Sequence, residues 1–309
     1  MSFSRNVLLW MSQNEWLKKH VPTWRFVKKA VKKFMPGETE DAAFEASIKY
    51  SSNNIQIVIT KLGENIAQLN DAELVRDHYL QLIDKINLSS LDVEISVKLT
   101  QLGFDLSEEK TKLFVTEIAK KIFNNLRNTF YIDIESSDYT QRTVDFYKNI
   151  LLGSENVGLC LQAYLYRTEK DLTELLELNS SIRLVKGAYK EPADIAFPEK
   201  AKVDENYFLL SKMMMNKTLE KNLRMIYATH DEKLIARIID ESKNIGLKKE
   251  QLEFQMLYGI KSSFQRKLAA EGFKVRVLIS YGQSWYPWYL RRLAERPANV
   301  WFVLKNLIS

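Results

Sequence analysis

The chain is poor in the residues that build disulfides and metal centres. Its 309 residues include one cysteine, Cys160, and three histidines, His20, His78 and His230. A single thiol cannot form an internal disulfide, and no zinc site of the multi-cysteine kind can be built from this set. No acidic residue lies at metal-ligand spacing from His230, so we expect no metal site. One lone cysteine suits a reducing compartment, where such a thiol is most often a small buried hydrophobic side chain.

Long hydrophobic runs are also absent. No stretch reaches the roughly 20 predominantly apolar residues that a helix needs to span a bilayer. The N-terminus has a short apolar patch at 7–11, but no small-residue cleavage site follows it, so we predict no signal peptide. The sequence therefore favours a cytoplasmic protein, and any membrane contact would be peripheral on the inner face.

Positive charge exceeds negative charge only modestly, with 45 Lys and Arg against 39 Asp and Glu and a net charge of +6. A basic amphipathic helix is predicted from Thr23 onward, ending at Pro36. Its apolar face holds Trp24, Val27, Val31 and Phe34, and its cations are Arg25, Lys28, Lys29, Lys32 and Lys33. This helix either packs on the rest of the protein or docks on anionic lipid headgroups. No nucleic-acid motif follows it, so we predict no nucleic-acid partner.

From residue 50 onward, short β-branched or apolar runs alternate with amphipathic helical patterns. Eight runs are present, beginning at Ile55, Val93, Phe130, Val157, Ile182, Arg224, Leu252 and Val275. Such alternation favours parallel strands joined by right-handed crossovers, and a set of this number closes most naturally into a barrel. We predict an α/β fold in which an N-terminal helical arm (residues 1–50) precedes a (β/α)8 TIM-type barrel (residues 51–309).

Polar side chains gather where the predicted strands end, and barrel enzymes place their chemistry at these carboxyl ends. The polar residues there are Glu64, Lys98, Asp133, Gln162, Arg183, Lys186, Thr229, His230 and Gln255, with Arg291 and Arg292 on the last predicted helix. Aligning so many polar groups around one mouth is costly unless a polar ligand or mutual pairing satisfies them. The mouth of the barrel is therefore the predicted site.

One heptapeptide carries a resemblance to a known family. Residues 183–189, Arg-Leu-Val-Lys-Gly-Ala-Tyr, resemble the signature of the proline dehydrogenases, which include the proline utilisation A enzymes and monofunctional bacterial relatives. Further matching segments are SVKLTQLG from Ser96, LCLQAY from Leu159, ATHD from Ala228, EFQMLYG from Glu253 and YLRRLAERPAN from Tyr289. Because these matches fall on almost every predicted strand end, the chain is identified as a member of that family.

The resemblance implies a noncovalent FAD across the barrel mouth. The cofactor-binding residues that it implies are Ile134, Gln162, Arg183, Val185, Lys186, Gly187, Ala188, Thr229 and His230. Among them Arg183 is expected beside flavin N5, where a fixed cation favours the reduced ring, and Arg183 and Asp133 are the expected catalytic residues.

The resemblance also implies a substrate pocket made of Lys98, Leu257, Leu278, Trp288, Arg291 and Arg292. Arg291 and Arg292 resemble the family's carboxylate clamp, because guanidinium groups bind a planar carboxylate through two parallel hydrogen bonds. Lys98 would add a third positive group, oriented by Asp133. Glu64 resembles a gate residue that pairs with the clamp arginines.

The implied reaction oxidises L-proline to Δ1-pyrroline-5-carboxylate by hydride transfer from C5 to flavin N5, and electrons then pass to a membrane quinone. Two positions depart from the family pattern, because Leu278 and Trp288 stand where tyrosines are usual. A dehydrogenase of 4-hydroxyproline or another cyclic amino acid therefore stays open. From the residues alone, two other classes also remain: a Schiff-base aldolase using Lys98 or Lys186, and a non-enzymatic scaffold that docks on membranes.

Overall fold

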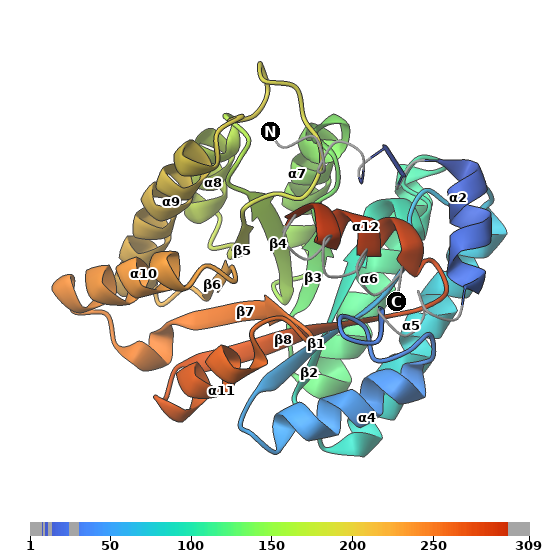
Figure 1. Ribbon diagram of the computed structural model, residues 1–309, viewed down its shortest axis with the longest axis horizontal. Coiled ribbons are helices and arrows are strands. Elements are labelled where there is room, and N and C mark those ends of the chain that lie inside the picture. Colours follow the sequence, from blue (N-terminus) through green and yellow to red (C-terminus); the bar gives the residue numbers. More distant parts are fainter. Residues whose placement is uncertain (1–7, 9, 12–13, 25–30, 296–309) are drawn as a thin grey trace, which may run out of the picture.

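The chain forms a closed barrel of eight parallel strands in the order of the sequence (Figure 1). In this computed structural model, residues 8, 10–11, 14–24 and 31–295 are described. The strands are β1 (Gln56–Lys61), β2 (Val93–Lys98), β3 (Phe130–Asp133), β4 (Val157–Gln162), β5 (Ser181–Val185), β6 (Met225–Ala228), β7 (Glu253–Leu257) and β8 (Lys274–Tyr281). β1 pairs with both β2 and β8, which closes the sheet. The predicted (β/α)8 fold class is confirmed.

Helices follow the strands and cover the outside of the barrel (Figure 1). They are α5 (Leu69–Ser89), α6 (Glu108–Leu126), α7 (Ser137–Leu151), α8 (Thr168–Glu177), α9 (Lys200–Lys221), α10 (Glu232–Asn244), α11 (Ser262–Ala270) and α12 (Trp285–Glu295), with 3-10 turns η2 (Leu99–Leu102) and η3 (Lys249–Gln251). Side-chain caps start several of them: Ser107 accepts the N–H of Lys110 in α6, and Asp231 accepts that of Leu234 in α10. The apolar faces of α5 to α11 pack on the strands in one continuous core, whereas α12 belongs to a second cluster.

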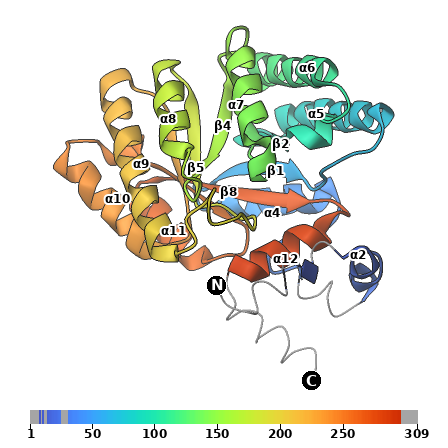
Figure 2. The ribbon, with the colours of Figure 1, turned by 90° about the horizontal axis from the view of Figure 1, so that it is seen from above.

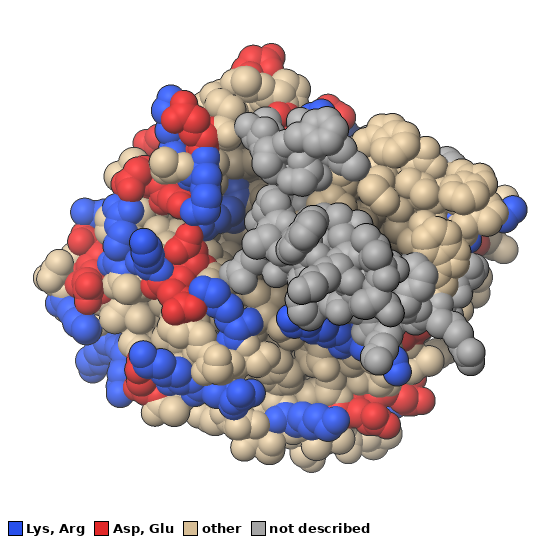
Figure 3. Space-filling view, viewed as in Figure 1, with Lys and Arg blue, Asp and Glu red and all other residues tan. Residues whose placement is uncertain are grey.

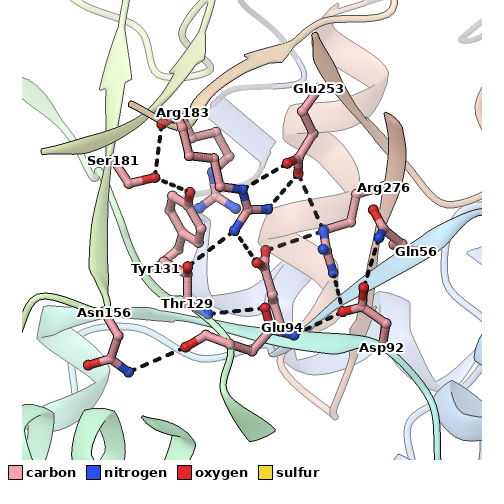
Figure 4. A network of polar contacts seen from close by, with 12 residues as sticks. Gln56, Asp92, Glu94, Thr129, Tyr131, Asn156, Ser181, Arg183, Glu253 and Arg276 are labelled. Atoms are coloured by element: carbon pink, nitrogen blue, oxygen red, sulfur yellow. Dashed lines mark hydrogen bonds and ion pairs between the residues drawn. The ribbon is translucent and has the colours of Figure 1, made fainter. Parts of the chain in front are cut away.

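The barrel interior is polar in its lower part. Alternate residues of a strand face the same side, so Glu94, Glu253 and Arg276 point inward from β2, β7 and β8. Figure 4 shows Glu94, Glu253 and Arg276 in one network. Arg224 bridges the two glutamates, and Arg276 contacts both of them. No pattern in the sequence predicts this network.

The N-terminal segment packs against α12 beside the barrel, where α2 (Glu15–His20) also lies (Figure 2). Val31 and Phe34 are buried in this contact, and the ring centroids of Phe34 and Tyr289 are 5.8 Å apart. A 3-10 turn, η1 (Val21–Thr23), follows α2. The predicted basic helix falls largely on residues 25–30, so Arg25, Val27, Lys28 and Lys29 lie outside the described residues.

A further helix, α4 (Glu40–Ser51), leads into β1. Ala43 and Ala46 belong to the same core cluster as the strands, so α4 packs on the barrel. The domain boundary expected at residue 50 stays a prediction. Within the described part of the chain, no helix is both long and apolar enough to span a bilayer.

Candidate functional site

A cleft of about 730 Å³ opens at the carboxyl ends of β1, β2 and β3. Its inner wall carries Glu64, Lys98 and Glu135, and α12 contributes Trp288 and Arg291 from the opposite side. This volume lies within the roughly 300–1,000 Å³ typical of small-molecule sites. The barrel therefore places a ligand-sized space where parallel barrels usually hold their active sites.

Glu64 lies between two cations in this cleft. Its Oε1 accepts a hydrogen bond from Arg291 Nη1 at 2.9 Å, and its Oε2 pairs with Lys98 Nζ. Burial on its own would raise the pKa of Glu64, but Lys98 and Arg291 together outweigh that effect and lower the pKa to about 2. The Arg291 guanidinium also lies 5.2 Å from the ring centroid of Tyr189.

A third cation, Arg183, lies deeper inside the barrel and is buried. It is the middle residue of β5 and 2% exposed, so it projects into the barrel rather than standing at the strand end. Its Nη2 donates to Ser96 Oγ at 2.8 Å and pairs with Asp133. Burial favours the neutral form of Arg183, but the carboxylate of Asp133 outweighs it and raises the pKa. Asp133 was expected to orient Lys98; the two residues are neighbours in register, but the ion pair described for Asp133 is with Arg183.

The segment after β5 makes a close backbone approach. Gly187 has a φ of +116°, and a Cβ there would lie 2.3 Å from the Tyr164 ring, so only glycine fits without displacement. The backbone N–H of Tyr164 donates to the carbonyl of Lys186 at 2.9 Å. The Lys186 ammonium pairs with Asp204 at 2.5 Å and with Asp231 at 2.9 Å.

Gln162, at the end of β4, presents an unused acceptor. The side chain is 3% exposed, and no donor among the described residues reaches its Oε1. A buried polar atom without a partner is costly unless a ligand satisfies it. Together with the tight turn at Gly187 and the buried cation of Arg183, this acceptor fits a flat, hydrogen-bonding group such as a flavin.

Comparison with known proteins agrees with this geometry. Residues 43–305 match the family model described as proline dehydrogenase. Proline dehydrogenase 2 of Bacillus subtilis (strain 168) is 36% identical over 98% of each chain, and the proline dehydrogenase of Deinococcus radiodurans is 34% identical over 90% of this chain and 89% of its own. The chain belongs to the proline dehydrogenase family.

A solved structure shares the fold of this proline dehydrogenase. Proline utilization A from Bdellovibrio bacteriovorus, inactivated by N-propargylglycine, superposes with a TM-score of 0.79 over 93% of this chain, at 21% identity. The chain spans 38% of that longer protein. Because the identity is low, this likeness supports the fold alone.

The other expected site residues surround the cations. Leu257 and Leu278 are neighbours in register on β7 and β8, and alternation places both on the interior face at the mouth. Ile134 follows β3, Val185 ends β5, Ala188 follows Gly187, and Thr229 and His230 follow β6. Arg292 lies on α12, but its side chain is outside the described residues, so the second half of the clamp stays a prediction.

Several residues near the site were missed in the sequence. Glu135, Asp204 and Asp231 all contribute carboxylates close to expected site lysines or to the cleft. Asp231 is the last residue of the ATHD segment, and Glu135 lies two positions after Asp133. Their closeness in sequence to expected site residues was the signal that could have identified them. Asp204 lies on α9, and no sequence pattern marked it.

The aldolase alternative does not agree with the proline dehydrogenase family to which the chain belongs. A Schiff-base lysine needs a lowered pKa. Burial favours a lower pKa for Lys98, but Tyr189 and Glu64 outweigh it and raise the pKa instead. Lys186 is held in its two ion pairs with Asp204 and Asp231.

Proposed function

We propose that this proline dehydrogenase uses noncovalently bound FAD to oxidise L-proline to Δ1-pyrroline-5-carboxylate, the first step of proline degradation. The observation that carries the proposal is a pair of partly buried cations, Lys98 and Arg291, in the cleft at the mouth of a barrel that holds the buried Arg183 below it. Lys98 and Arg291 suit the substrate carboxylate, and Arg183 suits an electron-accepting ring.

Arg291 and Lys98 have donors to spare for a substrate carboxylate. A guanidinium has five N–H groups and an ammonium has three, and Glu64 engages Nη1 and Nη2 of Arg291 and the single nitrogen of Lys98. Glu64 therefore orients both cations while leaving some of their donors for a ligand. Arg292 is proposed as the second guanidinium of the clamp. Fixing the carboxylate would place the amino-acid ring at a defined distance from the barrel interior.

The residues proposed to hold FAD are Ile134, Gln162, Arg183, Val185, Lys186, Gly187, Ala188, Thr229 and His230. When bound, the flavin supplies the acceptor for the hydride leaving C5. Arg183 provides the fixed positive charge, and Asp133 and Ser96 hold its guanidinium in place. Gln162 offers its buried Oε1 as an acceptor for a ring N–H.

The apolar mouth favours an unsubstituted ring. Leu257 and Leu278 offer no hydrogen bond, and burying a ring hydroxyl against them without a partner is unfavourable. A pocket of this kind discriminates by roughly 1–3 kcal/mol, which is enough to set a preference for L-proline over 4-hydroxyproline. Trp288 lines the cleft from α12.

A membrane quinone is the proposed electron acceptor, reached through a peripheral contact of the N-terminal arm. Trp10, Trp16 and Trp24 are 60%, 60% and 43% exposed, which is unusual for three large aromatic side chains in one segment. Figure 3 shows a mainly uncharged surface around α2, whereas charged side chains gather over α9 and α10. Tryptophan favours the interface between lipid and water.

Anaerobic mixing of the purified flavoprotein with L-proline tests the reaction. We expect loss of the oxidised flavin absorbance and formation of a product that reacts with o-aminobenzaldehyde. A flavin spectrum unchanged by L-proline, but bleached by another cyclic amino acid, would reassign the substrate. Purified protein that holds no flavin after reconstitution would overturn the proposal as a whole.

The membrane contact has its own test. Replacing Trp16 and Trp24 together by serine should reduce sedimentation with anionic, quinone-containing vesicles and lower quinone-coupled turnover. Turnover with a soluble dye acceptor should stay the same, because neither side chain lines the cleft. Unchanged vesicle binding would exclude this surface.

A further inference from the structure

The loop that carries Glu64 is held on both sides by one short turn. The 3-10 turn η2 follows directly after Lys98, and its Gln101 Nε2 donates to the carbonyl of Lys61 at 3.2 Å. On the other side of Glu64, the backbone N–H of Asn65 donates to Thr100 Oγ1 at 3.1 Å. The end of β2 thus supplies a partner of Glu64, and the turn that follows it directly supplies the anchors of the Glu64 loop.

Thr100 is itself fixed by a buried carboxylate. Glu135 accepts the backbone N–H of Thr100 at 3.1 Å with Oε1 and the Thr100 hydroxyl at 2.6 Å with Oε2. Because the hydroxyl hydrogen is directed to Glu135, the lone pairs of Oγ1 remain for Asn65. Asn65 has a φ of +53°, a conformation that a non-glycine residue adopts at a cost, so the loop gains from an external anchor.

Burial makes this arrangement specific. Thr100 is 1% exposed and Glu135 is 4% exposed, so water does not replace the hydrogen bonds that they share. Both carboxylate oxygens of Glu135 are occupied by a single residue of another loop. Such two-point contact fixes an orientation rather than merely a distance.

We propose that Glu135 and Thr100 are positioning residues: they hold the loop so that Glu64 orients Lys98 and Arg291 for the substrate carboxylate. This inference rests on the proposed role of those two cations. A loosely held Glu64 keeps its charge near the cations but no longer sets their directions. Binding of a carboxylate ligand must then also order the two cationic side chains, which costs conformational entropy and weakens binding.

The first test is Thr100→Val, which keeps the side-chain shape and removes the hydroxyl. We expect KM for L-proline to rise about 3- to 10-fold, with kcat within about 2-fold, the size expected for one lost buried hydrogen bond. Thr100→Ser should restore the wild-type KM because it retains the hydroxyl. Glu135→Gln replaces one of the two accepting carboxylate oxygens by an NH2 donor, so it should also raise KM. This variant is the alternative test if Thr100→Val does not fold.

A readout independent of turnover is binding of cyclopentanecarboxylate, which has the carboxylate and the ring but no amine to oxidise. Calorimetry on the holoenzyme should show the same fold-change in Kd as in KM. A double-mutant cycle then locates the effect: in a Glu64→Gln background, Thr100→Val should leave Kd unchanged within about 1.5-fold, because coupled residues are not additive.

Thr218→Val is the matched control, because its hydroxyl is also buried but bonds within α9, to the carbonyl of Met214 at 3.1 Å. It should leave KM and Kd alone. An equal effect of Thr100→Val with and without Glu64 would overturn the positioning role. Wild-type protein that binds neither L-proline nor cyclopentanecarboxylate would instead contradict the proposed function, so the two failures are distinguishable.

Discussion

Arg183 lies over the ring of Tyr131, with its guanidinium carbon 4.9 Å from the ring centroid. The guanidinium carbon of Arg224 lies 5.7 Å from the same ring centroid. Tyr131 therefore lies between Arg183, which is proposed to contact the flavin, and the charge network in the lower barrel (Figure 4). The Tyr131 hydroxyl lies 2.6 Å from Ser181 Oγ, and it is the ring that contacts the two arginines. The ring therefore separates two cations while stabilising both through its face.

Arg183→Lys tests whether the guanidinium is needed at this position. An ammonium has one nitrogen and cannot contact Ser96 and Asp133 while also reaching Gln255, as Nη2 and Nη1 of Arg183 do together. We expect kcat to fall about 100-fold, as when a preorganised electrostatic group is lost. The flavin-to-protein ratio, read from absorbance, shows whether cofactor binding is lost as well. A kcat equal to that of the wild type would show that charge alone suffices.

The lower network gives a prediction about stability. Glu253 accepts two hydrogen bonds from Arg224, at 2.7 and 2.8 Å, and contacts Arg276 at 3.3 Å. Glu253→Gln leaves these arginines without full compensation, and we expect a loss of about 3–5 kcal/mol in the free energy of unfolding. Chemical denaturation measures this loss.

A matched control for that change is Glu205→Gln. Glu205 also pairs with an arginine, Arg237, at 2.6 Å, but it is 61% exposed. Solvent screening should make its effect on the free energy of unfolding much smaller than that of Glu253→Gln. Equal effects of the two substitutions would contradict the importance of burial.

The fold was predictable because its signal is local. Each strand is a short apolar run, and the predicted starts at Ile55 and Val93 lie within one residue of β1 and β2. The charge network was not predictable, because its partners are remote: Arg224 and Glu94 are 130 residues apart in the chain. Periodicity marks which residues face inward, but it does not tell which of them meet.

The site shows the same limit. Motifs named Lys98, Arg291 and Glu64, which the structure brings together. They did not name Glu135, because its role depends on Thr100 in a different loop. Arg183 was expected at a strand end, but strand bounds inferred from sequence are imprecise by a residue or two, and β5 ends two residues later.

The pH dependence of carboxylate binding follows from the cations and their partner. Glu64, with a pKa of about 2, stays ionised far below neutrality, and the raised pKa values of Lys98 and Arg291 keep both charged. We expect the Kd of cyclopentanecarboxylate to be constant between about pH 6 and pH 9. A change in this Kd within that pH range, measured by calorimetry, would show that the ionisation of another group controls carboxylate binding.

The same shifts predict how stability changes outside that range. Glu64 has a folded pKa below its ordinary 4.5, so its stabilising contribution is present above that value and is lost as pH falls toward about 2. Lys98 has a folded pKa above its ordinary 10.5, so its contribution is present below that value and is lost as pH rises through the folded pKa. Glu64→Gln should flatten the acidic limb of a plot of Tm against pH.

Gly187→Ala tests the proposed cofactor cradle. A Cβ at this position would meet the Tyr164 ring at 2.3 Å, and its φ of +116° is strained for any other residue. We expect a cost of about 1–3 kcal/mol in stability together with a lower flavin-to-protein ratio. Gly153→Ala is the matched control, because no atom lies within 4 Å of a Cβ built there. If Gly187→Ala lowered Tm but retained full flavin, the turn would be structural only.

Leu278 is the residue that we propose to set the preference between proline and its hydroxylated form. It is the register neighbour of Leu257, and together they make an apolar wall at the mouth. Leu278→Ser supplies a hydroxyl that can bond a ring hydroxyl, so the ratio of kcat/KM for 4-hydroxyproline to that for L-proline should rise about 10-fold. Leu278→Met keeps the wall apolar and should leave the ratio within about 2-fold of the wild type, since volume-conserving apolar changes are tolerated. If both variants changed the ratio equally, pocket size rather than polarity would control the choice of substrate.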